Sequence, residues 1–457
     1  MQRTILFAVF TIIFLILAPT IVLYSQGYRM DWEKKKITQT GAFSFKALPP
    51  RADIFVNGKL IKKTNFFLGS ATTSTFLPGE YKVRIEKEGY YPWEKTLEIT
   101  PRGVTEAKFI VLFPKAVTFS STAENIEGFW PSPDQKWAII ETKSLQQVSL
   151  SIQNLATKEL ISLEKDTADS VKSVSWDATS QRFFIQFQSG NTRIQSISSN
   201  MQACRQIPCD LGFLEGSIEK AEFLPTQESR IVLLQNTGNS QILSAVDYAN
   251  QQIISLDTNV LAFVLLGNTV DWLDATGTIW QKQLDTNSPA QKLTHTPFSV
   301  KDAQPYELFL WRGTLFIKEG KQLFRFIYPE RLFEKIFDQI EFQQLDPRDE
   351  KILIVRNSEL WLYYLIDEYE QPQKRRGEKV FLTRFGQPIR SPQWMNGSYI
   401  AFGLDNAIKI IETDDRDGIN MVDIGILSAK KIFWDANTKS LIVLSDRTLL
   451  TSERIIR

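Results

Sequence analysis

Histidine and cysteine are scarce in this chain, which narrows the chemistry open to it. His295 is the only histidine in 457 residues, and this leaves little scope for imidazole acid–base catalysis or a histidine metal site. Cys204 and Cys209 are too few to form a zinc site without further ligands. Their close spacing favours a local disulfide in an oxidising compartment, and the alternative is a pair of free thiols in a surface loop.

Two charged segments resemble ligand-binding motifs in composition. Residues 413–418 (TDDRDG) resemble half a calcium loop, but its first and twelfth positions fall on Thr413 and Ile424, which are not acidic. Residues 374–376 (KRR) lie in a polar stretch, 367–379, where a phosphate or lipid site is the alternative to a solvated hairpin tip. We interpret the first segment as a tight turn between strands and the second as a hairpin tip.

The sequence lacks the common catalytic and cofactor motifs. It contains no P-loop, dinucleotide fingerprint, G-x-S-x-G elbow or H-E-x-x-H. Lys and Arg number 53 against 52 Asp and Glu, so there is no basic excess for nucleic acid. We therefore predict no catalytic, cofactor-binding or metal-binding residues and no cofactor, and we expect a protein that is not an enzyme.

A repeated block organises the larger part of the chain, residues 115–457. Each block has an aromatic residue, a polar turn rich in Asp, Ser or Pro, and then a β run. The spacing is about 40 to 52 residues, which is typical of four-stranded propeller blades. Clear blocks cover residues 129–140, 174–185, 222–234, 342–355, 394–402 and 433–444, and weaker ones cover 270–280 and 308–317.

These blocks predict a β-propeller of about seven blades, with eight as the alternative. The block WPSPDQKW (130–137) resembles the repeats of WD40-like and TolB-type propellers. We expect the short strand at 117–119 to complete the last blade, near Leu449, and so close the ring. Apolar residues at helical spacing in 329–340 suggest a short inserted helix.

Residues 38–114 show the alternation of half-buried strands separated by turn signals. Asn57-Gly58 between two β runs is a strong hairpin signal, and the segment predicts a small antiparallel β-sandwich. The segments PPRADIFVNGK (49–59), LPGEYKVRI (77–85) and KEGY (87–90) resemble the PEGA domain, although Arg51 replaces a glycine of its signature. The resemblance implies a surface-layer-like sandwich of envelope proteins, generally without catalytic activity.

The chain begins with a candidate membrane anchor. Residues 5–24 form a run without a charge that is long enough to cross a bilayer and lacks the small-residue cleavage pattern of a signal peptide. Residues 1–4 would be cytoplasmic and 25–37 would be a juxtamembrane linker. The positive charges at Arg29 and 34–36 oppose an outward orientation, but long domains escape the positive-inside rule.

Together these features predict an all-β, single-pass protein of the bacterial cytoplasmic membrane, with its bulk outside the cytoplasm. Residues 5–24 would contact membrane lipid, and the propeller would bind an unknown envelope protein or glycan, but no nucleic acid. One alternative is a cell-wall or surface-glycan-modifying enzyme with paired carboxylates in the propeller channel. The other is a structural, surface-layer-like component.

Overall fold

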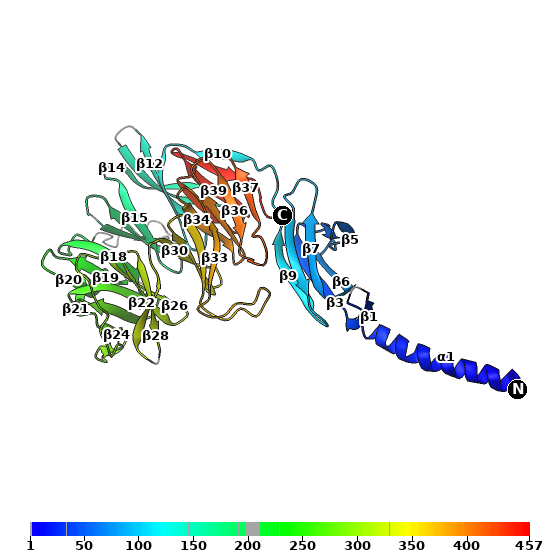
Figure 1. The fold of residues 1–457 in the computed structure, drawn as a ribbon. Helices are drawn as coiled ribbons and strands as arrows, with labels where there is room; N and C mark the ends of the chain where they lie inside the picture. Colours follow the sequence, from blue (N-terminus) through cyan, green and yellow to red (C-terminus); the bar gives the residue numbers. More distant parts are fainter. Residues whose placement is uncertain are drawn as a thin grey trace.

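A computed structural model describes residues 2–32, 34–144, 147–167, 169–190, 192–196, 211–227, 229–328 and 330–457. The chain has three parts in sequence order: a long helix, a small β unit and a large β unit (Figure 1). The predicted all-β class with one N-terminal helix is therefore confirmed. Cys204 and Cys209 lie outside the described residues, so their disulfide stays a prediction.

Helix α1 (Gln2–Ser25) is predominantly apolar after its first turn, and its window Ile5–Ser25 has a mean hydropathy of 2.8. It is long and apolar enough to cross a membrane, and none of that window is buried against the rest of the chain. Its hydroxyl groups are satisfied within the helix, because Thr11 and Thr20 donate to the carbonyls of Phe7 and Ile16. A short hairpin of β1 (Tyr28–Asp31) and β2 (Lys36–Gln39) follows directly.

Two sheets make up the small unit, and their inward-facing residues form one core. The first sheet has the order β6-β3-β9 and the second β5-β4-β7-β8. Phe43, Ile54 and Val83 are fully buried between them. The strands are β3 (Gly41–Leu48), β4 (Asp53–Val56), β5 (Lys59–Lys63), β6 (Ser70–Phe76), β7 (Gly79–Glu86), β8 (Trp93–Ile99) and β9 (Val104–Val111).

The sandwich departs from the expected antiparallel arrangement at one strand pair. β9 runs parallel to β3, with Phe43 opposite Thr105. Parallel neighbours need a long connection between them, and here the strands β4 to β8 lie between β3 and β9 in sequence. After β8 the chain crosses from the second sheet back to the first, where β9 pairs with β3. The parallel pairing brings the end of β9 to the boundary with the large unit.

The large unit consists of eight consecutive sheets in the described part of the chain. Blades 1 to 4 are β11–β14, β15–β17, β18–β21 and β22–β25, and blades 5 to 8 are β26–β29, β30–β33, β34–β37 and β38–β40 with β10. Blades 1 to 4 comprise β11 (Ile126–Pro131), β12 (Trp137–Ser144), β13 (Gln147–Asn154), β14 (Leu160–Thr167), β15 (Val171–Trp176), β16 (Arg182–Phe187), β17 (Thr192–Ser196), β18 (Ser217–Phe223), β19 (Arg230–Asn236), β20 (Gln241–Asp247), β21 (Gln252–Thr258), β22 (Val260–Leu266), β23 (Thr269–Asp274), β24 (Ile279–Gln283) and β25 (Gln291–Lys292). The others comprise β26 (Tyr306–Trp311), β27 (Thr314–Glu319), β28 (Gln322–Ile327), β29 (Leu332–Phe337), β30 (Ile340–Leu345), β31 (Lys351–Arg356), β32 (Glu359–Tyr364), β33 (Lys379–Arg384), β34 (Arg390–Asn396), β35 (Tyr399–Gly403), β36 (Ile408–Glu412), β37 (Met421–Gly425), β38 (Lys431–Asp435), β39 (Ser440–Ser445), β40 (Thr448–Ser452) and β10 (Phe119–Ala123).

Hydrophobic clusters between neighbouring blades close these sheets into a ring. One cluster joins each consecutive pair of blades, and another joins blade 8 to blade 1, where Ile442 and Leu444 pack with Phe129 and Ile140. β10 pairs with β40, so an early strand completes the last blade. The propeller and its predicted closure near Leu449 are confirmed, and the closing strand lies slightly after the expected 117–119.

The repeated polar turn has a structural explanation. In blade 2, Asp177 Oδ1 accepts hydrogen bonds from the backbone N–H groups of Gln181 at 2.8 Å and Arg182 at 3.1 Å. In blade 6, Asp346 Oδ1 accepts hydrogen bonds from the backbone N–H groups at the same relative positions, those of Glu350 and Lys351. An aspartate after the aromatic residue therefore ties the connection between the first two strands of a blade.

Two sequence interpretations need correction. The described residues form eight sheets, which corresponds to the alternative of eight blades, where the sequence prediction favoured about seven. The expected helix in 329–340 is wrong, because β29 (Leu332–Phe337) forms the outer strand of blade 5. Its apolar residues matched helical spacing, but the segment pairs with β28, and the Phe326 and Phe333 rings on these two strands are in contact.

Asp271 in β23 generates a pH prediction. Burial raises the pKa of Asp271 from 3.8 to about 6, because the carboxylate loses its hydration and has one amide partner, Gln281. The folded state therefore holds a proton that the unfolded state has released, and stability falls as pH rises through this window. By linkage, the ionised Asp271 lowers the free energy of unfolding by about 3 kcal/mol above pH 7.

We expect Asp271→Asn to raise the free energy of unfolding at pH 8 by up to about 3 kcal/mol and by roughly half of that at pH 5. Urea unfolding at both pH values measures the difference. Asp405→Asn, whose side chain is 55% exposed, is the control and should shift little at either pH. An equal gain for Asp271→Asn at both pH values would contradict the assigned cause.

Candidate functional site

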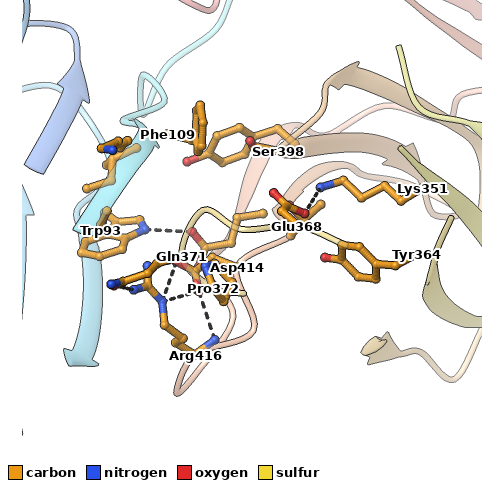
Figure 2. A pocket seen from close by; sticks show the side chains of 16 residues that line it. Trp93, Phe109, Lys351, Tyr364, Glu368, Gln371, Pro372, Ser398, Asp414 and Arg416 are labelled. Atoms are coloured by element: carbon orange, nitrogen blue, oxygen red, sulfur yellow. Dashed lines mark hydrogen bonds and ion pairs between the residues drawn. The ribbon is translucent and has the colours of Figure 1, made fainter. Parts of the chain in front are cut away.

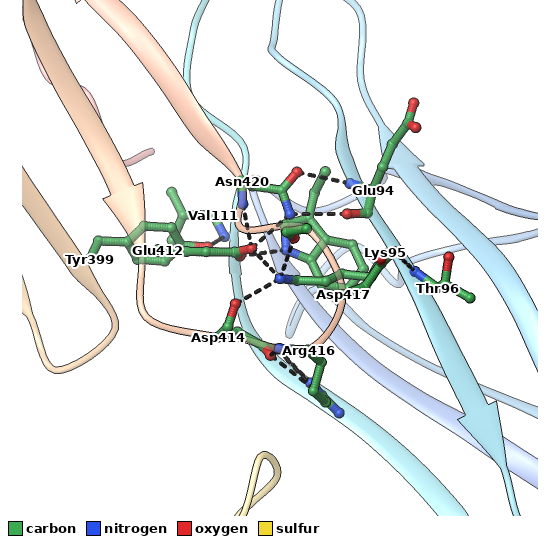
Figure 3. A network of polar contacts seen from close by, with 12 residues as sticks. Glu94, Lys95, Thr96, Val111, Tyr399, Glu412, Asp414, Arg416, Asp417 and Asn420 are labelled. Carbon is green, nitrogen blue, oxygen red and sulfur yellow. Dashed lines mark hydrogen bonds and ion pairs between the residues drawn. The ribbon is translucent and has the colours of Figure 1, made fainter. Parts of the chain in front are cut away.

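The sandwich contacts one face of the propeller through two loops. Because the strands of a blade are antiparallel and consecutive, the connections between strands one and two and between strands three and four lie on the same face, here called the docked face. The loop 365–378 of blade 6 and the loop 413–420 of blade 7 are both connections between strands three and four. Figure 3 shows the second loop against β8 of the sandwich.

Lys95 of β8 is the centre of this contact. Its ammonium is fully buried and lies 2.7 Å from Glu412 Oε1 at the end of β36. It also donates to the carbonyl oxygens of Asp414 and Gly418, each at 2.7 Å. An ammonium has three donors, so all the hydrogen-bonding capacity of Lys95 is directed at the propeller.

Glu412 receives donors from both parts of the molecule. Trp93 Nε1 of the sandwich donates to Oε2 at 2.8 Å, and Asn420 donates to Oε1 from its backbone N–H at 2.8 Å and its amide at 2.7 Å. Burial raises the pKa of Glu412, while the Lys95 charge and the Asn420 hydrogen bonds act in the opposite direction. The carboxylate therefore depends on these partners to stay ionised.

The edge of the sandwich sheet is also satisfied by the propeller. β8 is the outer strand of its sheet, so alternate backbone groups lack a strand partner. Asn420 accepts from Glu94 N–H and donates to the Glu94 carbonyl, while Asp417 accepts from Thr96 N–H at 2.7 Å. The hydrogen bonds from Thr96 lower the pKa of Asp417. The loop 413–420 thus covers an edge that would otherwise be open.

The loop 365–378 of blade 6 is bonded to β9 of the sandwich. Gln371 accepts from Glu106 N–H at 2.9 Å and donates to the Val104 carbonyl at 3.1 Å. Arg416 of the other loop donates to the Glu106 carbonyl at 2.9 Å. Lys374 pairs with Asp415 at 2.7 Å, so the two loops are also bonded to each other.

The two charged segments singled out from the sequence therefore meet at this junction. Residues 413–418 do connect two strands, as predicted, but they carry the contact with β8. In 374–376, Arg375 and Arg376 are exposed as expected of a hairpin tip, whereas Lys374 has only 10% of its side chain exposed. Burial lowers the pKa of Lys374, but hydrogen bonds to Asp415 and Glu378 raise it overall.

An apolar contact completes the junction. Val111 at the end of β9 and Phe113 just beyond it belong to the hydrophobic cluster between blades 7 and 8. Tyr399 packs edge-on against Phe113 and its hydroxyl accepts from Val111 N–H at 2.8 Å. Full burial raises the pKa of Tyr399 well above its ordinary value, so the phenol stays protonated.

A cavity of about 40 Å³ remains inside the contact (Figure 2). An open groove of about 480 Å³ lies beside it. The charged groups lining the cavity are paired, as Lys351 with Glu368 and Arg416 with Asp414. In the described ranges, no group of three or more His, Cys, Asp or Glu could hold a metal ion. The paired groups at this junction bond the sandwich to the propeller.

One residue of β8, Lys95, indicates this junction in the sequence, although the alternation of the strands alone did not identify it. Trp93, Lys95 and Leu97 share one face of β8, and all three are buried. A lysine in phase with buried apolar residues requires a buried acceptor set. The identity of Glu412 as that acceptor could not be read from the sequence, because it lies more than 300 positions away.

Residues 42–111 match the family model of the PEGA domain. The match runs from the second residue of β3 to the end of β9, and the resemblance read from the sequence is confirmed. The PEGA domain here is the sandwich that docks on the propeller.

Solved propellers resemble the large unit at low identity. The C-terminal WD40 domain of Sif2 aligns with a TM-score of 0.49 and 11% identity, over 75% of this chain and 99% of that chain. BamB from Moraxella catarrhalis aligns with a TM-score of 0.43 and 14% identity, over 74% of this chain and 99% of that chain. The assignment of the propeller rests on the eight sheets themselves. No curated protein matches this chain.

The buried pair generates a stability prediction. Lys95→Met leaves the Glu412 carboxylate buried without its cation, which we expect to cost about 3–5 kcal/mol in the free energy of unfolding. Glu412→Gln should be destabilising as well, and the double variant should cost at least about 1 kcal/mol less than the sum. Urea unfolding of the four proteins gives the coupling energy.

Arg390→Met is the matched control, because it removes an ion pair with half-exposed partners, Arg390 and Asp405. Its effect should stay below about 1 kcal/mol. Additive losses in the double variant would show that Lys95 and Glu412 do not act as a pair.

Proposed function

We propose that this protein is a membrane-anchored, non-enzymatic platform outside the cytoplasm that presents the propeller to a protein partner. A propeller joined to a PEGA domain fits a protein-interaction role. The observation that carries the proposal is the continuous bonding from α1 through the PEGA domain to the docked face. Because that face is partly occupied by the PEGA domain, the opposite face is the one offered for binding.

The helix is bonded to the folded part of the chain. Thr40 N–H donates to the Gly27 carbonyl at 2.9 Å, and Gln39 donates to the Gln26 carbonyl. Arg29 donates to the Tyr24 carbonyl and lies over the Tyr24 ring. These contacts favour a retained anchor over a cleaved signal sequence, because cleavage after the span would remove Tyr24 and leave Arg29 without these contacts.

An extracytoplasmic location is supported by the family resemblance and by the chain's length beyond the span. PEGA domains occur in envelope proteins, and a soluble part of this size crosses the membrane with little regard to flanking charge. A non-enzymatic role is supported by the junction, where the acidic and basic groups neutralise one another. The presented face carries the connections between strands two and three, including the exposed Asn357 and Asn406.

One labelling experiment tests both parts of the proposal. Asn406→Cys on the presented face and Asp349→Cys on the docked face would each be made with Cys204 and Cys209 replaced by serine. Cells with any outer layer permeabilised would receive a membrane-impermeant maleimide carrying a photo-crosslinker. We expect both positions to be labelled in intact cells, and illumination to yield a defined protein adduct from position 406 but not from 349.

Each readout has its own contrary result. Labelling of either cysteine only after lysis would place the propeller in the cytoplasm. Equal adducts from both positions, or adducts from 349 alone, would show that the face opposite the PEGA domain is not the binding surface.

A further inference from the structure

The PEGA domain carries an exposed apolar and basic surface far from the propeller. All five residues of β5 (KLIKK) are exposed, and the loop 64–69 that follows presents three large apolar side chains. Phe67 is 89% exposed, and Phe66 and Leu68 are more than half exposed. Apolar side chains grouped in this way on a soluble domain mark a contact surface. We call β5 and this loop the tip surface.

The loop is built to hold these side chains outward. Asn65 accepts from Leu68 N–H at 2.8 Å and donates to the Ser70 hydroxyl at 2.8 Å. Gly69 has a φ of +63°, and a Cβ there would lie 2.2 Å from the Ala47 carbonyl oxygen. Only glycine fits this turn, so the conformation that exposes Phe66 and Phe67 is fixed by the backbone.

Positive charge surrounds the apolar tip. Lys59, Lys62 and Lys63 lie on β5, and Arg51 stacks over the Phe66 ring at 4.3 Å. One carboxylate, Asp53, offsets Lys63 at 3.0 Å. Cations on the neighbouring strand and at Arg51, beside protruding aromatic side chains, match the chemistry of an anionic lipid surface.

The β1–β2 hairpin repeats this composition beside the end of α1. Trp32 at its turn is 81% exposed, Ile37 is exposed, and residues 34–36 are three exposed lysines. In Figure 1, β5 and the hairpin both lie on the side of the PEGA domain that faces α1 and away from the propeller. A bilayer crossed by α1 would therefore meet both surfaces at once.

We propose that the tip surface rests on the membrane, with Phe66, Phe67 and Leu68 in the interfacial layer and the surrounding lysines on anionic headgroups. This inference rests on the proposed membrane anchor. The bilayer is the favoured occupant because α1 brings it to the same side of the domain and because the charge is complementary. Contact at a second point would stop the PEGA domain from swinging about the end of the helix.

Spin-label accessibility in the full chain tests this proposal. Labels at Phe67→Cys, at Leu15→Cys in α1 and at the exposed propeller residue Ile426→Cys would be compared, with Cys204 and Cys209 replaced by serine. The protein would be reconstituted in vesicles of phosphatidylglycerol or of phosphatidylcholine alone. Collision rates with oxygen, which partitions into lipid, and with a water-soluble nickel chelate would be measured for each label.

In phosphatidylglycerol we expect the oxygen-to-nickel ratio at position 67 to lie nearer that of position 15 than that of position 426. Replacing Lys59, Lys62 and Lys63 by glutamine, or using phosphatidylcholine, should lower the ratio at 67 and leave the one at 15 unchanged. A label at 67 that behaves like 426 in both lipids, while 15 stays in the bilayer, overturns the proposal but keeps the anchor.

The remaining outcomes are also decisive. A label at 67 shielded from both reagents would show that protein, such as a second copy, covers the tip surface, which overturns the lipid assignment. An aqueous label at position 15 would overturn the anchor itself and with it the proposed function.

Discussion

A lysine ammonium without water must be surrounded by acceptors, and in this protein that requirement joins the two domains. Lys95 is fully buried, and its acceptors, Glu412, Asp414 and Gly418, all belong to the propeller. Separating the domains would expose the pair to water but also open the edge strand β8 and the Tyr399–Val111 contact. Because separation would break all of these contacts together, we infer that the PEGA domain and the propeller behave as one body.

This coupling gives the helix control over the orientation of the propeller. The hairpin after α1 is bonded to the start of the sandwich, where Arg102 N–H donates to the Thr40 carbonyl. The sandwich is bonded to blades 6 and 7 at its far side. In the proposed membrane-anchored protein, the proposed binding face of the propeller would be held at a defined angle to the membrane, instead of moving on a linker.

The sequence predicted the elements better than their contacts. Alternation and turn residues identified the sandwich, and the block with its aspartate, as at Asp177 and Asp346, identified the propeller, because these patterns depend on local geometry. The parallel β9 and the strand β29 were missed, since pairing between distant segments decides them. Lys95 was the one residue whose position in the strand period pointed to the junction, and its partner could be found only from the structure.

Pulsed spin-label distance measurement between Lys59→Cys on the PEGA domain and Asn406→Cys on the propeller tests the central claim most directly. Cys204 and Cys209 would again be serine. A single rigid body predicts one narrow distance distribution, which broadens when Lys95→Met removes the buried cation. A broad distribution in the protein with Lys95 intact would show that the domains move independently and would contradict the account.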